Sequence, residues 1–577
     1  MKKTKIVATI GPASESEEVL RKLFTEGVNV ARLNFSHGSH QEHKLKIDRI
    51  KKLRREMDLP IGIMLDTKGP EIRLGDIDGE VLLQSGEEFI LTNKDLLGNE
   101  KIASISYKDL YKDVRVGGKI LIDDGLVELL VKEIRREEII TEVENSGAIS
   151  SHKGVNVPGA NLNLPALTER DIEDIKFGVK EDIDFIAASF VRSREDVLAI
   201  RKVLEEERDY TTKIISKIES QRAVEEIDEI IEVSDGIMVA RGDLGVEIET
   251  EAVPIVQKEI IKKCNIVGKT VITATQMLDS MIRNPRPTRA ETNDVANAVL
   301  DGTSAVMLSG ETASGKYPLE SVVTMRKILE YTENTIDHDE ILENRIRDVE
   351  KSMTNAIGRS ACVIARDLGA EAIITATTSG NTSRAIAKFR PETPIIASTP
   401  FEKIKNQLSL VWGISPVKVL NFKDTDNLID ASMEIAVAKG FIKSGDLVVL
   451  TAGVPAGIAG STNLLKIESV SEILGRGTPI GKKKKKARAI VAKTIEDLED
   501  GFKTKDIIVC QGTDGRMIPY MEKSSGFITE EAGFTSNGAV AAISLGKTAI
   551  VGVKDITEKI KTGDIITIDP VDGTVRR

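Results

Sequence analysis

The stretch "KIISKIES", residues 213–220, joins an apolar, β-branched run to two opposite charges, Lys217 and Glu219, near its end. Side chains two residues apart in a strand lie on the same face, so these two charges point the same way. The same arrangement, an apolar run that ends in a polar turn and precedes a helical segment, occurs eight times in about the first 310 residues. The runs are KIVATIGP (5–12), NVARLNFSHG (29–38), IGIMLDTKGP (61–70), DFIAASFVRS (184–193), TKIISKIES (212–220), GIMVARGDLG (236–245), TVITATQM (270–277) and SAVMLSGET (304–312).

These eight units predict a closed parallel barrel. Amphipathic segments such as residues 16–27 and 194–207 lie between the runs, with apolar residues at helical spacing. Continuously apolar strands that alternate with helices are typical of a parallel sheet covered on its outer face. We therefore expect an α/β fold built on a (β/α)8 TIM barrel, whose active site lies at the C-terminal ends of the strands, where the polar turns fall.

The spacing of the runs also predicts further domains. About 115 residues separate the third run from the fourth, whereas one strand–helix unit takes about 30. The alternating sequence of this interval predicts an inserted all-β domain, which at a barrel mouth would act as a lid. The expected boundaries are 1–70 and 168–330 for the barrel, 71–167 for the lid, 331–474 for an open α/β effector-binding domain, 475–488 for a lysine-rich linker that contains Lys482 to Lys486, and 489–577 for a small C-terminal α/β domain.

The composition argues against several functional classes. The 80 basic and 91 acidic residues are mixed along the chain and give a formal charge of -11, so no basic face for nucleic acid is indicated. The lysine run at 482–486 lacks aromatic neighbours, which disfavours nucleic-acid binding there as well. No apolar run is long enough to cross a membrane, and residues 1–12 do not have the pattern of a signal peptide. The three cysteines lack metal-ligand spacing, which indicates reduced thiols and a cytoplasmic location.

The polar turns carry the side chains of a candidate active site. Glu219 and Asp243 offer the carboxylate oxygens that Mg2+ prefers. Arg32 and Arg73 are suited to the oxygens of a phosphoryl group. The backbone amides after Arg241 open a helix and are suited to a carboxylate. A cage for a second, weakly hydrated cation is suggested by the oxygens of Asn34, Ser36, Asp66 and Thr67. Thr275 belongs to the rest of the rim.

These groups together favour phosphoryl transfer on a substrate that carries both a carboxylate and a phosphate, because this reaction depends mainly on positioning and charge neutralisation. Three alternatives stay open on the residues alone. Lys217 and Glu219 could form a solvated ion pair at a strand end. Lys217 could form the Schiff base of an aldolase. The chain could also be a metabolite sensor, although a sensor has no need for all five of Lys217, Glu219, Asp243, Arg32 and Arg73.

Six segments closely resemble the pyruvate kinase family, and the resemblance covers residues 1 to about 470. They are VARLNFSHG, LDTKGPEIR, ISKIES, MVARGDLG, ITATQMLDSM and the long, very specific block from Arg286 to Pro318. The resemblance implies transfer of phosphate from phosphoenolpyruvate to ADP, which gives pyruvate and ATP, with Mg2+ (or Mn2+) and K+ as cofactors. It also implies a homotetramer that is regulated by a phosphorylated effector.

The resemblance further implies roles for single residues. Lys217 is similar to the lysine that neutralises the phosphoryl group during transfer, and Thr275 to the threonine near the enolate face that is protonated. The other implied roles are Glu219 and Asp243 for Mg2+, Arg32 and Arg73 for phosphate oxygens, Gly242 and Asp243 for substrate, Asn34, Ser36, Asp66 and the Thr67 carbonyl for K+, and Asn34, His37 and Arg73 for nucleotide. His37 is equally consistent with a solvated loop histidine.

Two positions distinguish this chain within the family pattern. Asn163, in the stretch GVNVPGANLNLPAL, stands where the family usually has an aspartate near the nucleotide-bound metal. The resemblance therefore does not imply this metal contact at Asn163. Glu71, in KGPEIR, stands where family members that do not need K+ resemble one another in having lysine. We therefore expect activity to require K+.

The loop at residues 377–383 resembles the family's site for a sugar-phosphate effector. Thr, Ser and Gly at the start of a helix can bind phosphate through amides and hydroxyls, and an ordinary capped helix N-terminus is the alternative. The expected effector residues are Thr377, Thr378, Ser379, Gly380, Asn381, Thr382 and Ser383. A sugar bisphosphate, a sugar monophosphate and AMP remain equally open as the effector.

Residues 526–553 resemble the mobile phosphohistidine domain of phosphoenolpyruvate-utilising enzymes. The phosphorylated histidine of that family lies in a Thr-x-His-Ala-Ala turn, but here the turn reads Thr535-Ser536-Asn537-Gly538-Ala539. An asparagine amide cannot carry a phosphoryl group, and no histidine follows His338. Cys510, the only thiol in this part of the chain, is expected to be a buried structural thiol. We therefore expect a structural or regulatory module without phosphotransfer activity.

Overall fold

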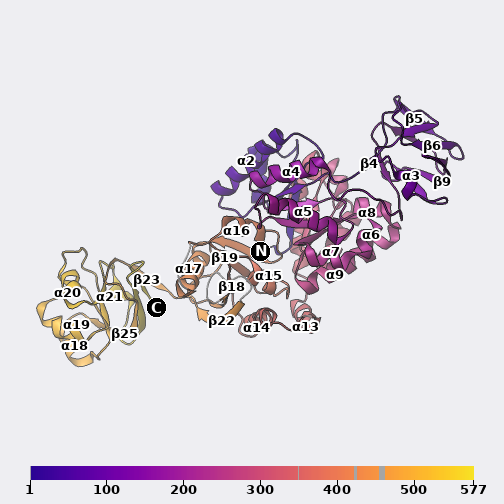
Figure 1. Ribbon diagram of the computed structural model, residues 1–577. Coiled ribbons are helices and arrows are strands. Elements are labelled where there is room, and N and C mark those ends of the chain that lie inside the picture. The colour runs from indigo at the N-terminus through magenta and orange to yellow at the C-terminus, as the bar shows by residue number, and fades with distance from the viewer. Residues whose placement is uncertain (1, 349, 421–424, 454–461) are drawn as a thin grey trace. The chain divides into compact units, whose positions relative to one another are not determined.

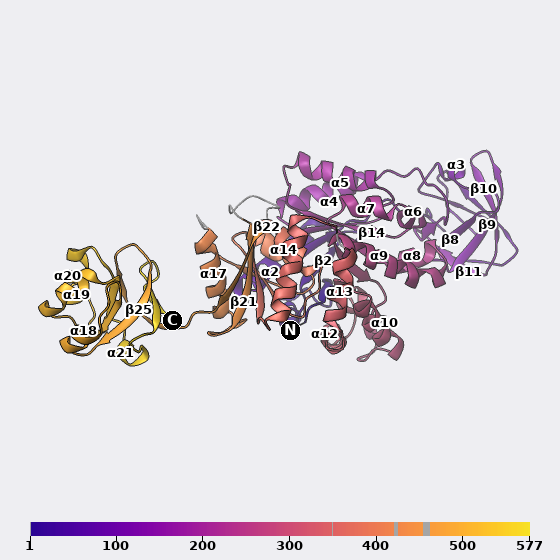
Figure 2. The same cartoon turned by 90° about the horizontal axis from the view of Figure 1, so that it is seen from below.

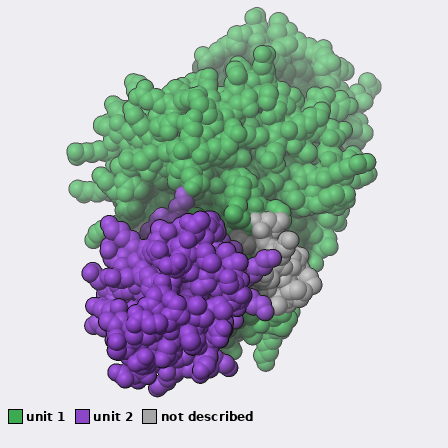
Figure 3. All heavy atoms as spheres, turned by 90° about the vertical axis from the view of Figure 1, so that its left-hand side faces the viewer, with its two compact units in different colours: residues 1–435, 449–466 green, residues 436–448, 467–577 purple. Residues whose placement is uncertain are grey.

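The computed structural model describes residues 2–348, 350–420, 425–453 and 462–577. The chain forms two compact units, residues 1–435 with 449–466, and residues 436–448 with 467–577 (Figure 3). Within the described residues, no helix is both long enough and apolar enough to span a membrane.

The first unit contains the predicted barrel, whose covering helices are seen in Figure 1, and each of the eight predicted runs forms one of its strands. The strands are parallel and close in the order β1-β17-β16-β15-β14-β13-β3-β2. Their bounds are β1 Lys5–Thr9, β2 Val30–Asn34, β3 Gly62–Asp66, β13 Phe185–Ala188, β14 Lys213–Ile218, β15 Gly236–Ala240, β16 Thr270–Ala274 and β17 Ala305–Leu308. The predicted (β/α)8 fold is therefore confirmed.

Helices surround the barrel and begin at residues suited to capping. Ser39, Thr168 and Thr288 each accept a hydrogen bond from the backbone of the first helical turn. The acidic side chain three positions on accepts a hydrogen bond from the backbone N–H of the capping residue. The helices are α1 Glu17–Thr25, α2 His40–Glu56, α4 Glu169–Lys180, α5 Arg194–Glu206, α6 Gln221–Glu225, α7 Ile227–Val233, α8 Arg241–Glu247, α9 Val253–Val267, α10 Arg289–Leu300, α11 Gly310–Ala313 and α12 Pro318–Glu333, with the short 3-10 helices η1 Thr250–Ala252 and η2 Asp279–Ile282.

The barrel has an inner and an outer apolar layer, which explains why its strands are apolar on both faces. Val7 of β1 packs inside the barrel with Met64, Met238 and other strand residues. Its neighbours Ile6 and Ala8 face outward and pack in the larger layer beneath the helices. Alternation with period two thus buries successive side chains in different cores.

The inserted segment forms the predicted all-β domain, which we call the lid (Figure 2). It holds a seven-stranded sheet, β4-β12-β8-β9-β10-β6-β7, and a two-stranded sheet, β11-β5, around one apolar core. The elements are β4 Ile72–Arg73, β5 Glu80–Leu83, β6 Glu88–Thr92, β7 Ile102–Ser104, α3 Leu110–Asp113, β8 Lys119–Ile122, β9 Val127–Arg135, β10 Glu138–Val143, β11 Gly147–Ser150 and β12 Gly154–Asn156.

After the barrel, helices alternate with strands of a five-stranded sheet, β20-β19-β18-β21-β22, as predicted for an open α/β domain. Strands β18, β19 and β20 run parallel. The elements are α13 His338–Asp348, α14 Met353–Asp367, β18 Ala372–Ala376, α15 Asn381–Ala387, β19 Ile395–Thr399, α16 Glu402–Leu408, β20 Ile414–Lys418, α17 Thr425–Ala438, β21 Leu447–Gly453 and β22 Thr462–Ser469.

The C-terminal residues form an eight-stranded sheet, β23-β30-β29-β25-β26-β27-β28-β24. The linker expected at 475–488 is wrong, because this segment holds the end of β23, all of β24 and the start of β25. Lys485 and Lys486 pair with β29 through their backbones, while the Lys486 side chain stays exposed on one face of the sheet. The elements are β23 Ile473–Arg476, β24 Thr478–Ile480, β25 Lys485–Ala492, α18 Ile495–Gly501, β26 Ile507–Cys510, η3 Gly515–Met517, α19 Ile518–Lys523, β27 Gly526–Thr529, α20 Asn537–Leu545, β28 Thr548–Val551, α21 Ile556–Lys559, β29 Ile565–Asp569 and β30 Thr574–Arg576.

Candidate active site

The end of β14 holds a buried ion network centred on Lys217. The Lys217 ammonium lies 2.8 Å from Glu219 Oε1 and 3.4 Å from Asp66 Oδ1, and it donates to Ser189 Oγ at 2.7 Å. Burial by itself lowers the pKa of Lys217, but the carboxylates of Asp66 and Glu219 outweigh this effect and raise the pKa above its usual value. Lys217 is therefore a protonated, buried cation at neutral pH, and the solvated surface ion pair considered from the sequence is wrong.

Asp66 joins this network to the neighbouring strands. Arg32 Nε donates to Asp66 Oδ2 at 2.5 Å, and Arg32 Nη1 donates to Thr9 Oγ1 at 2.8 Å. Burial raises the pKa of Asp66. The positive charges of Arg32 and Lys217 lower this pKa by more than burial raises it, so the net shift is downward. The carboxylate is ionised and fixes both cations at the barrel mouth.

Four residues expected around a monovalent cation lie at the adjacent ends of β2 and β3. Asn34 is the partner of Asp66 in the strand register, and Asn34 Oδ1 accepts a hydrogen bond from the Ser36 amide at 3.1 Å. The Thr67 carbonyl accepts from Ser189 Oγ at 2.7 Å. The carbonyl, amide and carboxylate oxygens fit the hard-oxygen preference of K+ by chemistry, since each retains a free lone pair.

Glu219 and Asp243 form the candidate divalent-cation site. Glu219 is buried, with 1% of its surface exposed, and its Oε2 accepts from the Phe190 amide at 2.5 Å. Burial raises the pKa of Glu219, Lys217 lowers it, and the Asp243 carboxylate raises it again. Across the described residues, the Asp243 carboxylate makes no hydrogen bond or ion pair. Two repelling carboxylates, one of them without a partner, fit a divalent cation.

The protein supplies few ligands to this cation. In the described part of the chain, no group of three or more His, Cys, Asp and Glu side chains is arranged to hold a metal. Mg2+ usually keeps several waters and takes other ligands from a phosphorylated substrate. A site with two carboxylates is therefore consistent with Mg2+ bound together with substrate.

A cavity of about 630 Å3 lies between the barrel mouth and the lid. Glu219, Asp243 and Arg73 line it, together with Asp124 and Lys153 of the lid. Burial raises the pKa of Asp124, and the charge of Asp243 raises it further. The lid thus adds a third carboxylate beside the candidate metal site, in a space that suits a small charged ligand.

Arg32 and Arg73 have different partners. The Arg73 guanidinium binds Glu71 at 2.6 Å and donates to the His152 carbonyl at 2.7 Å, whereas Arg32 is held by Asp66. Their joint action on one phosphoryl group therefore remains a prediction. Glu71 supplies a negative charge directly beside Arg73.

The turn after β16 is held in a strained conformation. Thr275 has a φ of 64°, which a β-branched residue rarely adopts, and Gln276 follows with a φ of 55°. Arg241 donates to the Thr275 carbonyl at 2.7 Å, and the Gly242 amide donates to Thr275 Oγ1 at 2.8 Å. Such strain persists where surrounding contacts impose it, most often at functional sites. Thr275, expected on the rim, thus contacts the turn at Gly242.

The remaining nucleotide positions lie in loops. His37 is exposed, and its carbonyl accepts from His43 Nε2 at 2.8 Å. The backbone N–H of Asn163 donates to Asp113 Oδ2 at 3.0 Å within the lid. No contact at either position tests a nucleotide role, so the assignment of His37 and the consequence of Asn163 stay predictions.

The loop at 377–383 uses several of its polar groups internally. Thr377 Oγ1 accepts from the Gly380 amide, Thr382 pairs with Thr462, and Ser383 pairs with Thr375. Gly380 has a φ of 82°, which favours glycine. Thr378, Ser379 and Asn381 are partly or fully exposed and are the members available to a ligand.

Several residues of the site were not predicted from the sequence. Ser189 lies between Lys217 and Asp66, and the Phe190 amide binds Glu219. Arg192 donates to the carbonyls of Leu164 and Pro165, where the chain returns from the lid. All three follow β13, one of the predicted runs, so the rule that places active sites at strand ends could have identified them.

A buried lysine, facing carboxylates and a covering lid at the C-terminal mouth define an enzyme of the (β/α)8-barrel class. Comparison with known proteins matches residues 1–322 to the barrel domain of pyruvate kinase, 355–468 to its alpha/beta domain and 502–573 to the mobile domain of PEP-utilising enzymes. The chain is 50% identical to pyruvate kinases of Staphylococcus epidermidis and Geobacillus stearothermophilus, over 100% of this chain and 99% of each relative.

A crystal structure of a pyruvate kinase from Cryptosporidium parvum has a TM-score of 0.78 and 40% identity, and the match covers 81% of this chain and 96% of that one. The chain belongs to the pyruvate kinase family. It is a glycolytic phosphotransferase that makes pyruvate and ATP, with phosphoenolpyruvate and ADP as substrates.

Proposed function

We propose that phosphoryl transfer takes place in the cavity beneath the lid, with Lys217 as the catalytic cation. The observation that carries this proposal is the buried Lys217 ammonium, which Asp66 and Glu219 keep protonated. A fixed cation in a buried site stabilises negative charge that develops on the phosphoryl group. The raised pKa also argues against the aldolase alternative, because a Schiff base requires a neutral amine.

Glu219 and Asp243 hold Mg2+ (or Mn2+) in this proposal, and Asn34, Ser36, Asp66 and the Thr67 carbonyl hold K+. The unpartnered Asp243 carboxylate and the pairing of Asn34 with Asp66 in the strand register support these two sites. When bound, the metal ions neutralise charge on the phosphoryl and enolate oxygens. Arg32 of β2 and Arg73 of β4 bind phosphate oxygens, and Asn34, His37 and Arg73 contact the nucleotide.

The turn at Gly242 orients the substrate. Its amides bind the carboxylate of phosphoenolpyruvate, while Thr275 lies at the enolate face that receives a proton. The lid excludes water that would otherwise consume the phosphoryl group. The contact between Gly242 and Thr275 supports a shared place for these two functions.

Regulation involves the loop at 377–383 in this proposal, through a phosphorylated effector in a cytoplasmic homotetramer. The exposed Thr378, Ser379 and Asn381 offer hydroxyl and amide groups to a phosphate. The effector remains one of a sugar bisphosphate, a sugar monophosphate or AMP. The C-terminal domain has a structural or regulatory role, since its turn holds Asn537 where the phosphohistidine would be.

A coupled assay of pyruvate formation from phosphoenolpyruvate and ADP tests the core of the proposal. Omission of Mg2+ and, separately, of K+ should each reduce turnover to near background. Full activity in the presence of a chelator, at an unchanged K+ concentration, would contradict the assignment of Glu219 and Asp243 to a divalent cation.

A further inference from the structure

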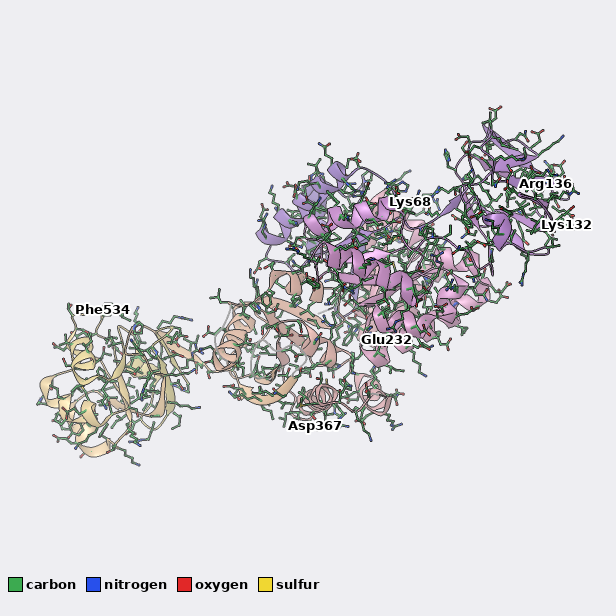
Figure 4. All side chains as sticks on the ribbon, viewed as in Figure 1. Lys68, Lys132, Arg136, Glu232, Asp367 and Phe534 are labelled. Atoms are coloured by element: carbon green, nitrogen blue, oxygen red, sulfur yellow. The ribbon has the colours of Figure 1, made fainter. Side chains whose placement is uncertain are left out.

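A second cavity, of about 420 Å3, lies at the opposite end of the barrel from the active site. The base of the barrel forms one side through Lys213, Asp235 and Lys269, and helix α15 forms the other through Arg384 and Lys388. Glu232, labelled in Figure 4, marks the barrel side of this cavity. The cavity is separate from the lid and from every residue assigned to the chemistry.

The charges around this cavity do not balance. Four cationic side chains line it with two carboxylates. Both carboxylates are already paired, Asp235 with Arg201 and Lys213 at 2.7 and 3.0 Å, and Glu232 with Arg194 at 2.5 Å. Among the residues that the structure describes, the other cavity cations form no ion pair, and they are Lys269, Arg384 and Lys388.

These three cations retain donors that no protein acceptor uses. Arg384 Nη2 donates to the Ser379 carbonyl and to Asn381 Oδ1, whereas Nε and Nη1 have no acceptor in the described chain. The Lys269 ammonium gives two of its three hydrogens to the carbonyls of Ile231 and Glu232. The ammonium of Lys388 lies over the Phe389 ring and makes no hydrogen bond in the described part.

Partial burial makes the unbalanced charge costly. Burial lowers the pKa of Lys269, of Arg384 and of Lys388, and nearby carboxylates only partly offset the shift. The absence of a side chain at Gly268 lets the Lys388 stem pass against the barrel base. An anion in the cavity would lie among all three groups and relieve this cost.

We infer that this cavity binds the phosphate group of a small phosphorylated metabolite. A phosphate monoester carries a charge of about -1.5 to -2 with three strong acceptor oxygens, which matches three unpaired cations better than a carboxylate does. The volume lies within the usual range for small-molecule sites, so a sugar or nucleoside attached to the phosphate has room. The site adjoins the proposed effector loop, since Asn381 also lines the cavity and Arg384 contacts Ser379 and Asn381. It differs from that loop in Lys269 and Lys388, which belong to neither the loop nor the active site.

Labelling with pyridoxal 5'-phosphate tests this inference at the level of single lysines. Its aldehyde forms an imine with a neutral lysine amine near a bound phosphate, and borohydride reduces the imine to a stable amine that peptide mapping locates. On the full chain, Lys388 or Lys269 should react at least about tenfold faster than Lys202, an exposed helical lysine without an ion pair. Glycerol 3-phosphate, AMP or inorganic phosphate should each slow this labelling if it occupies the site. The compound that protects at the lowest concentration indicates whether the phosphate belongs to a sugar-like alcohol, to a nucleotide or to the free ion.

Three variants keep the test specific. Lys388→Gln should raise the Kd of the best protecting compound at least about tenfold in calorimetry, while Lys202→Gln leaves it unchanged. The double variant Thr378→Ala with Ser379→Ala should retain labelling of the cavity lysines even if it abolishes activation. Labelling of Lys269 and Lys388 no faster than that of Lys202, without protection by any of the three compounds, would overturn the inference.

Discussion

Replacement of Lys217 by methionine removes the positive charge of this side chain and keeps much of its length. Removal of one preorganised hydrogen-bond donor to a developing oxyanion costs about 10^2 to 10^3 in kcat. Lys217 supplies a full charge in a buried site, where electrostatic interactions are stronger than in water. We therefore expect Lys217→Met to lower kcat by at least about 10^3, which corresponds to about 4 kcal/mol, with little change in substrate binding.

The same substitution should alter the electrostatics of its neighbours. Lys217 lowers the pKa of Glu219, so its loss raises that pKa further and favours protonation of Glu219 at neutral pH. Asp66 keeps its contact with Arg32 and remains paired. The variant should therefore fold, with weaker Mg2+ binding that is restored in part as the pH rises. At a saturating Mg2+ concentration, substrate binding should change little.

A coupled assay of pyruvate formation measures kcat, and isothermal calorimetry with phosphoenolpyruvate measures binding. Lys213→Met is a matched control, because Lys213 lies on the same strand and pairs with Asp235 at the other end of the barrel. The control should keep near-normal kcat. A folded Lys217→Met variant with kcat within tenfold of the unmodified enzyme would refute the catalytic role.

Four further outcomes are expected. In buffer without Mg2+, Asp243→Asn should raise the Tm by about 2 °C, because it removes repulsion with Glu219, and it should abolish stabilisation by added Mg2+; a Mg2+-dependent Tm shift that survives the substitution would contradict this. Activity should require K+, because the carboxylate of Glu71 cannot replace a cation, and equal rates in K+ and tetramethylammonium at matched ionic strength would count against it. Thr378→Ala with Ser379→Ala should abolish activation by a phosphorylated effector but spare basal turnover, whereas unchanged activation would place the effector elsewhere. Removal of residues 473–577 should leave kcat within about twofold and lower thermal stability, and a truncated protein that is folded, tetrameric and inactive would contradict a purely structural or regulatory domain.

Local sequence patterns were sufficient for the main architecture. Each of the eight barrel runs is apolar on both faces because its alternate side chains enter two different cores. The sequence shows this as continuous apolar runs, for example at residues 5–12 and 270–277. The linker at 475–488 was wrong for the opposite reason. Lysines and glycines resemble a solvated connection locally, and only pairing with β28, β29 and β30 shows that these residues are strands.

The sequence by itself determined the pairing of Lys217 with Glu219, because two residues of strand separation place both side chains on one face. Only the tertiary structure decided that Asp66, at the end of β3, and Ser189, directly after β13, complete the Lys217 network. The physical reason is the distance along the chain over which each effect acts. Strand and helix periodicity act over a few residues, whereas the charge state of a buried group depends on every partner that closure of the barrel brings within a few ångströms.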